Sequence, residues 1–215
     1  MLVYTYFYSE LFAFISCVYA YRKLDGNFKI FFPFLAFIVA FELVSIYGLL
    51  LWHHTNAWSG NFEAILELGV YGRFMASLDK RRTYRIKVYI AIAVCIAIAL
   101  INIFFIQGFW ALNTISLVLQ NTLVATLVCI YYYNLLNNSE EYPDLLRFPP
   151  FFATVGLLLY SLTNFFYYAF FSYMLSVKNY HFFIVARVIS EISNVFLYTL
   201  LAISFLCFLR TKKAS

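Results

Sequence analysis

Ionisable side chains fall inside long apolar stretches of this sequence, where they are the first candidates for chemistry. A charge at the centre of a lipid bilayer costs at least a few kcal/mol, so such a residue indicates a functional site by default. Arg187 and Glu191 are one helical turn apart and share a helix face. The buried carboxyl candidates are Glu10, Glu42, Glu63, Glu67 and Glu191.

The carboxyl groups are expected at similar depths in the membrane. At about 1.5 Å per residue, Glu67 lies roughly 9 Å below the outer surface, Glu10 about 12 Å, Glu191 about 13 Å and Glu42 about 15 Å. Arg187 lies about 8 Å deep by the same count. The polar residues expected beside them are Gln120 and Asn121, Asn164, and Ser190 and Asn194.

Two interpretations of this polar layer remain open. The first is an outward-facing cavity for a small ligand or ion, lined by Glu10, Glu42, Glu67, Arg187, Glu191, Asn194, Gln120 and Asn164. Four carboxyls to one guanidinium require protonation of some carboxyls or a bound cation. The second interpretation is that these groups only hydrogen-bond between helices, where such contacts average about 0.6 kcal/mol.

Metal chemistry is not expected. His53, His54 and His181 all fall near the outer surface close to Glu63, which is the arrangement a shared metal site would need. However, the adjacent pair lacks the i,i+4 spacing of helical ligands. The four cysteines lie in apolar segments without C-x-x-C spacing, which favours hydrophobic packing over metal binding or disulfides. We therefore predict neither a metal nor a cofactor.

The elements that must position these residues are membrane helices. Of 215 residues, 64% are hydrophobic and 12% charged, against about 25% charged in soluble domains. A span needs about 20 mostly apolar residues. The predicted fold is all-α, a single seven-helix domain over residues 1–215, with the N-terminus outside and the C-terminus cytoplasmic. The expected spans are 2–20, 30–52, 61–78, 88–106, 112–134, 149–175 and 182–209.

The loop charges favour seven spans over six. Lys and Arg concentrate on the cytoplasmic side of membrane proteins. With seven spans, twelve Lys and Arg residues lie on the inner side and only Lys178 lies in an outer loop. Without the third span, the best orientation places about ten of these residues inside and four outside. The inner residues are Arg22, Lys23, Lys29, Lys80, Arg81, Arg82, Arg85, Lys87, Arg147, Arg210, Lys212 and Lys213.

Several seven-helix families lack their defining residues here. The last span has no lysine for a retinal Schiff base, no H-x-x-x-H serves a zinc hydrolase, and no Pro-Gln dipeptide is present. The lone Ser59-Gly60 pair lies in an expected loop, unlike the serine of a rhomboid-type protease. No complete catalytic motif is present, so we do not expect an enzyme.

Three regions resemble a group of small bacterial seven-helix membrane proteins for which no activity is established. The first joins Glu42 to NFEAILELGVYGRF, which contains Glu67 and Tyr71. The second is PPFFATVGLLLYSLTNFFYYAF, with Pro150, Gly156, Tyr160 and Asn164, and the third is RVISEISNVFLYTLLAISFLC, with Asn194. The resemblance implies an integral membrane architecture and no mechanism.

The functional expectation is a non-enzymatic sensor or accessory subunit in the cytoplasmic (inner) membrane. Its alternatives are a proton- or cation-coupled transporter and an intramembrane lipid-modifying enzyme. The lipid bilayer is the expected partner, and nucleic acid is not. Two partners for the basic loop stay open, a protein at the cytoplasmic face and anionic lipid. That loop carries Lys80, Arg81, Arg82, Arg85 and Lys87.

Overall fold

The apolar stretches fold as helices, because a helix satisfies its backbone hydrogen bonds without water. The computed structural model describes residues 2–138, 145–176 and 180–211. Within these ranges there are seven α-helices and no β-strand, so the all-helical prediction is confirmed for this part of the chain. The helices are α1 (Leu2–Ala20), α2 (Phe31–Ile46), α3 (Ala57–Leu78), α4 (Arg82–Ile101), α5 (Thr114–Asn138), α6 (Pro149–Ser176) and α7 (Tyr180–Thr211).

Four helices are long and apolar enough to cross a membrane, rather than the seven expected. They are Arg82–Ile106, Thr114–Asn137, Pro149–Phe171 and His181–Leu209, in the part of the chain that the structure describes. α2 is apolar but has only 16 residues. α3 carries Glu63, Glu67 and Arg73, which lowers its apolar character. The four apolar helices indicate a membrane protein.

The second predicted span, 30–52, is too long. α2 ends at Ile46, and the chain turns at Gly48, which has a φ of +70°. The Leu49 amide donates to the Val44 carbonyl (3.1 Å), and the Gly48 amide donates to the Ser45 carbonyl (2.9 Å). This pair of bonds is a Schellman motif, in which a left-handed glycine ends a helix. Glu42 therefore lies one turn from the helix end, much nearer to it than predicted.

Two further helix starts differ from the prediction. α3 begins at Ala57 instead of 61, helped by the Thr55 hydroxyl, which accepts from the Ala57 amide (3.1 Å). α4 begins at Arg82 instead of 88, so Arg82, Arg85 and Lys87 belong to its first two turns and not to a loop. Long basic side chains tolerate such positions because their charged ends extend to water.

Smaller differences affect the remaining helices. The fourth predicted span, 88–106, ends in a π-helical turn at Asn102–Ile106. α5 is shifted from 112–134 to 114–138, whereas α6 and α7 each start or end within two residues of the predictions. Short 3₁₀ turns occur at Tyr21–Lys23 and Leu145–Arg147.

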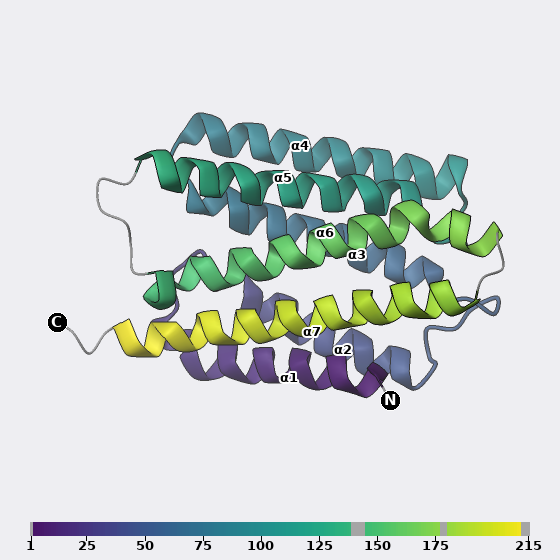
Figure 1. Cartoon of the computed structure of the whole chain (residues 1–215), viewed down its shortest axis with the longest axis horizontal. Helices are drawn as coiled ribbons and strands as arrows, with labels where there is room; N and C mark the ends of the chain where they lie inside the picture. The colour runs from purple at the N-terminus through teal and green to yellow at the C-terminus, as the bar shows by residue number, and fades with distance from the viewer. Residues whose placement is uncertain (1, 139–144, 177–179, 212–215) are drawn as a thin grey trace.

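The helices run side by side along the long axis of the molecule (Figure 1). α7 packs against both α1 and α6, α5 packs against α6, and α3 contacts α4 and α5. The α1–α2 and α3–α4 connections and the end of α7 lie together, and we call this the basic end. The basic residues that the structure describes there are Arg22, Lys23, Lys29, Lys80, Arg81, Arg82, Arg85, Lys87 and Arg147.

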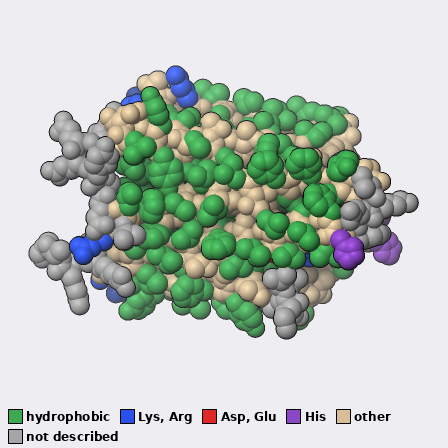
Figure 2. Space-filling view, viewed as in Figure 1, with side chains coloured by type: hydrophobic (Ala, Val, Ile, Leu, Met, Phe, Trp, Pro, Cys, Tyr) green, Lys and Arg blue, Asp and Glu red, His purple; other side chains and the backbone are tan. Residues whose placement is uncertain are grey.

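The opposite end carries His53, His54 and His181, and we call it the histidine end. Figure 2 shows blue Lys and Arg side chains at one end, purple His side chains at the other, and a largely apolar flank between them. Lys178, Lys212 and Lys213 lie outside the described residues.

Phenylalanines fill the interior toward the basic end. The rings of Phe28 and Phe208 are 4.9 Å apart, and both Phe28 and Phe31 lie 5.0 Å from Phe74. Phe205 packs against Phe31 at 5.9 Å. This cluster packs the start of α2 and the end of α7 against α3. The polar interior lies in the half of the bundle nearer the histidine end.

The small residues of α3 allow one close helix contact. A Cβ atom on Gly72 would lie 2.4 Å from Cδ1 of Ile92 on α4, whereas one on Gly69 would meet no atom within 4 Å. Gly72 therefore leaves space for the Ile92 side chain of α4 against α3, on the side of α3 away from its glutamates.

Candidate functional site

A cavity of about 290 Å³ lies inside the bundle, and its walls come from α1, α2, α3, α5, α6 and α7. Every member of the predicted ligand set reaches this one cavity. The residues concerned are Glu10, Glu42, Glu67, Gln120, Asn164, Arg187, Glu191 and Asn194. The structure thus brings together side chains from six helices, and their role in binding remains a prediction.

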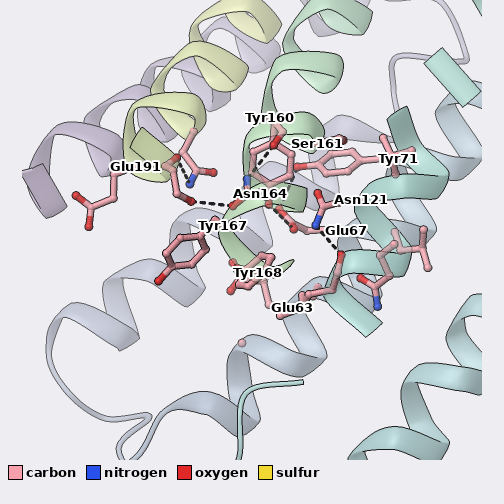
Figure 3. A pocket seen from close by; sticks show the side chains of 18 of the residues that line it. Glu63, Glu67, Tyr71, Asn121, Tyr160, Ser161, Asn164, Tyr167, Tyr168 and Glu191 are labelled. Carbon is pink, nitrogen blue, oxygen red and sulfur yellow. Dashed lines mark hydrogen bonds between the residues drawn. The ribbon is translucent and has the colours of Figure 1, made fainter. Parts of the chain in front are cut away.

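Glu67 is held by two tyrosines at the centre of the site (Figure 3). The Tyr71 hydroxyl donates to Oε1 of Glu67 at 3.1 Å, and the Tyr160 hydroxyl donates to Oε2 at 2.9 Å. Tyr71 lies one turn further along α3, whereas Tyr160 comes from α6. Two phenol donors offset part of the loss of hydration that burial imposes on a carboxylate.

Glu42 and Glu10 form the α1–α2 side of the cavity. The Tyr6 hydroxyl donates to Oε2 of Glu42 at 3.0 Å. Glu10 is only 3% exposed, and its Oε2 is buried without a hydrogen-bond partner among the described residues. A buried polar oxygen without a donor costs about 1–3 kcal/mol. Glu10 therefore brings one unpaired, buried oxygen to the α1–α2 side of the cavity wall.

A chain of polar contacts links α6 to α7. Ser190 donates to Oδ1 of Asn164 at 2.7 Å, and Asn164 Nδ2 donates to the Tyr160 carbonyl at 3.0 Å. Asn194 donates to the Ser190 carbonyl at 3.3 Å. Ser161 lies beside this chain in Figure 3, and its buried hydroxyl makes no hydrogen bond within the described structure. It is the second unsatisfied group in the cavity wall.

Arg187 is already engaged by a carboxylate. Its Nε donates to Oε1 of Glu191 at 2.8 Å, as expected for an i,i+4 pair. The Arg187 side chain is 57% exposed and that of Glu191 is 15% exposed. Arg187 therefore marks the edge of the cavity, and its charge is shared with the nearest carboxylate before it can balance any other.

The predicted set omitted Glu63, although its charge was recognised. Glu63 lies one turn before Glu67 and lines the same cavity. Both side chains are deep in the bundle, and the area they retain faces the cavity. The spacing of four residues was the signal that could have placed Glu63 in the site, because i and i+4 share a helix face.

Tyrosines of the wall were also missed as site residues. Tyr6, Tyr167, Tyr168 and Tyr198 line the cavity together with Tyr71 and Tyr160. Tyr160, Asn164 and Tyr167 recur at i, i+4 and i+7 on α6, so their shared face could have been read beside Asn164. With 19 tyrosines in the chain, residue type alone did not distinguish these six.

The cavity wall contains more acidic than basic side chains. Its carboxyls are Glu10, Glu42, Glu63, Glu67 and Glu191, and Arg187 is the one Lys or Arg among the lining residues that the structure describes. Since Arg187 pairs with Glu191, four carboxyls lack a basic partner in the wall. A cavity of this composition complements a cation.

A network of amides closes the site near the histidine end. The Asn61 side chain accepts from the Asn113 amide (2.9 Å) and donates to the Ala111 carbonyl (2.8 Å). The Asn102 side chain donates to Asn113 Oδ1 and to Gln107 Oε1 (2.8 Å for the latter). These bonds fix the start of α3 to the α4–α5 connection, whose Leu112 lines the cavity.

The histidines lie apart from this wall. His53 packs against the Trp110 ring at 4.6 Å, and neither it, His54 nor His181 lines the cavity. Within the described residues, no three His, Cys, Asp or Glu side chains converge on a position where they could hold a metal ion. The histidine metal site considered from the sequence thus gains no geometric support.

Comparison with known proteins adds no functional assignment. No protein-family model matches the chain. No curated protein and no solved structure shows significant similarity to it. The geometry of the cavity is therefore the basis for a functional conclusion.

Proposed function

We propose that this chain is a binding protein of the cytoplasmic membrane whose cavity takes a small organic cation, such as an amine. It would act as a non-enzymatic sensor or accessory subunit. The observation that carries the proposal is the excess of carboxyls in the wall: Glu10, Glu42, Glu63 and Glu67 have no basic partner there, because Arg187 is paired with Glu191. Burying several carboxyls together is costly unless protons or a cation compensate them.

Two unsatisfied oxygens show that helix packing does not pair every polar group of the cavity wall. Oε2 of Glu10 and the hydroxyl of Ser161 are both buried without a hydrogen-bond partner in the described structure, and both residues line the cavity. Packing alone would favour pairing these groups or replacing them with apolar ones. An ammonium group, with its N–H donors, complements the carboxyl groups that line the cavity.

The aromatic wall supports an organic cation. Tyr71, Tyr160, Tyr168 and Tyr198 line the cavity among the carboxyls. Tyrosine rings attract ammonium groups, with gains of about 0.5–2 kcal/mol per contact. A cavity of about 290 Å³ lies near the lower limit of ligand pockets, which is about 300 Å³. A small amine is therefore a better match than a large solute.

The charge asymmetry of the bundle supports seven crossings with the N-terminus outside. Lys and Arg gather at the basic end, and this is the cytoplasmic signature in multi-pass proteins. α1, α2 and α3 then cross beside the four helices that meet the length and composition of a span, and the face that carries their glutamates lies inward, away from lipid. The cavity consequently lies in the outer half of the membrane.

The basic end would contact anionic lipid headgroups or a partner protein. Lys80, Arg82 and Arg85 are exposed there. Arg81 is also exposed, but it donates to both carboxylate oxygens of Asp79, at 3.1 and 2.6 Å, and this contact holds the pKa of Asp79 below its usual range. A sensor passes its signal to a partner, and the exposed basic side chains offer a surface for one.

Calorimetry on the full chain in lipid nanodiscs tests the proposed function. We expect ethylammonium or propylammonium chloride to bind and the neutral analogues ethanol and propanol not to bind. Glu63→Gln should weaken ethylammonium binding at least tenfold, because a charge-assisted hydrogen bond contributes about 1.5–3 kcal/mol. Asp79→Asn, on the exposed α3–α4 connection, is the matched carboxyl control and should not change it.

Binding of the neutral analogues with equal affinity would overturn the proposal, as would equal effects of Glu63→Gln and Asp79→Asn. Uptake of labelled ethylammonium into proteoliposomes, abolished by Glu67→Gln, would replace the binding protein with a cation-coupled transporter. The phenylalanine cluster toward the basic end favours binding, since it fills the path that transport would need. Ser161 hydrogen-bonds to no base in the described structure, so nothing supports a serine-dependent lipid hydrolase.

A further inference from the structure

An apolar groove lies on the other side of the helices that form the cavity wall. It has a volume of about 380 Å³ and runs between α6 and α7. Its α6 side extends from Leu162 to Met174, a length of about 18 Å at 1.5 Å per residue. Phe166, Phe170 and Ile189, which are part of it, are exposed on the flank of the bundle. We call this the α6–α7 groove.

Tyr167 separates the α6–α7 groove from the carboxyl-rich cavity, because it lines both. Tyr167 lies close enough to Arg187 and Glu191 to interact electrostatically with both. On α7 the two surfaces alternate along the chain: Ala186 and Ile189 line the groove, whereas their neighbours Arg187 and Ser190 line the cavity. One helix pair thus places a hydrocarbon-compatible surface directly beside a cation-compatible one.

We propose that the ligand is an amphiphile, with an ammonium headgroup in the cavity and a hydrocarbon chain in the α6–α7 groove. This inference rests on the proposed function and specifies the class of ligand. The carboxyls supply charge complementarity for the head, and the groove supplies an apolar path of suitable length for the chain. The amphiphile enters from the bilayer past Tyr167, which lines both the groove and the cavity.

A second apolar groove, between α5 and α6, is the natural comparison. It has a volume of about 520 Å³ and shares Asn121 with the cavity. Asn121 is neutral, and its amide already donates to the Leu117 carbonyl at 2.8 Å. At the α6–α7 boundary a cation meets the Arg187–Glu191 pair, whose charges balance each other, and the ring of Tyr167, which lines both surfaces. An aromatic ring attracts an ammonium group, whereas the Asn121 amide has no ring face, so Tyr167 favours the α6–α7 groove.

The headgroup must provide the selectivity. Hydrocarbon chains gain little by leaving lipid for an apolar groove, since both surroundings are apolar. Ordinary membrane lipids can therefore occupy either groove weakly. An ammonium amphiphile is retained because its head reaches the carboxyls, so blocking the α6–α7 groove should affect a long-chain amine and spare a short one.

The test compares dodecylammonium with ethylammonium on the full chain in nanodiscs, with binding to empty nanodiscs subtracted. Ala186→Trp fills the α6–α7 groove, and Thr126→Trp fills the α5–α6 groove as the matched control. We expect Ala186→Trp to weaken dodecylammonium binding at least tenfold while ethylammonium binding stays within twofold. Thr126→Trp should leave both affinities within twofold of wild type.

The outcomes separate this inference from the proposed function. If Ala186→Trp leaves dodecylammonium binding intact, or if Thr126→Trp removes it, the chain lies elsewhere and the inference is overturned while the amine cavity stands. If wild type binds neither amine, both proposals fail. If Ala186→Trp does not fold, a dodecylamine with a diazirine in its chain decides the question on wild type. Labelling at 166–174 or 182–189 supports the α6–α7 groove, and labelling confined to 122–133 overturns it.

Discussion

At the scale of single residues, Glu67 shows how the fold stabilises an acid inside the bundle. Its donor Tyr71 is fixed by the local geometry of α3, because residues four apart share a face. Its other donor, Tyr160, is 93 positions away along the chain, so that bond forms only when α6 packs correctly. The two rings also meet edge to face at 6.2 Å. Glu67 thus couples helix packing to the polarity of the cavity.

Removing the Tyr160 hydroxyl should destabilise the fold. Tyr160→Phe leaves Oε2 of Glu67 without its donor, and we expect a loss of about 1–3 kcal/mol in the free energy of unfolding. Thermal unfolding in detergent, followed by the reaction of the buried cysteines with a thiol reagent, measures the loss. Tyr19→Phe, at a 75% exposed position, is the control and should unfold like wild type. An unchanged midpoint for Tyr160→Phe would contradict the importance of this bond.

At the scale of elements, α3 organises the site. It presents Glu63, Glu67 and Tyr71 to the cavity, and its start is held by the Asn61–Asn113 contact. Gly72 allows α4 to approach from another side, where Ile92 occupies the space that a Cβ atom would need. A larger side chain at position 72 must displace the Ile92 side chain or move α3 away from α4, and the second change would move both glutamates relative to Tyr160.

A large side chain at Gly72 should therefore disturb both stability and binding. We expect Gly72→Leu to lower the free energy of unfolding by about 1–3 kcal/mol, as overpacking of a filled interior does. Gly69→Leu, one turn earlier, adds the same side chain where no atom lies within 4 Å and should be tolerated. The same thiol-reaction assay compares the two variants. Equal midpoints would show that α3 and α4 can separate without cost.

At the scale of the whole molecule, the two ends differ in charge and in what fills the interior between them. Phenylalanines occupy the half near the basic end, and the polar cavity occupies the other half. Four helices have the length and composition of membrane spans. If α1, α2 and α3 also cross, the α2–α3 connection and the α3–α4 connection lie on opposite sides of the membrane.

Single cysteines can test this topology in intact cells. In a Cys129→Ser background, we expect His54→Cys to react with a membrane-impermeant thiol reagent from outside. Asp25→Cys and Lys80→Cys should react only after the membrane is opened. All three native residues are exposed, but Asp25 and Lys80 lie at the basic end, whereas His54 lies at the histidine end. Reaction of positions 54 and 80 from the same side would show that α3 does not cross.

Much of the helical layout followed from local chemistry. Apolar stretches must form helices in lipid because unpaired backbone groups there are costly, and α6 and α7 were therefore located within two residues of the predicted bounds. The boundary errors lie where local hydrogen bonds decide, as at Gly48, where a Schellman motif ends α2 after 16 residues. Apolar composition continues past that glycine, so hydropathy alone placed the end too late.

The sequence by itself identified the charged residues that face inward, because charge in an apolar stretch is visible without coordinates. Tertiary structure alone decided that Tyr160 donates to Glu67, that Glu63 joins the cavity, and that Glu10 and Ser161 keep unsatisfied oxygens. The reason is physical: helix periodicity determines which residues share a face, whereas the rotation and spacing of packed helices determine which faces meet.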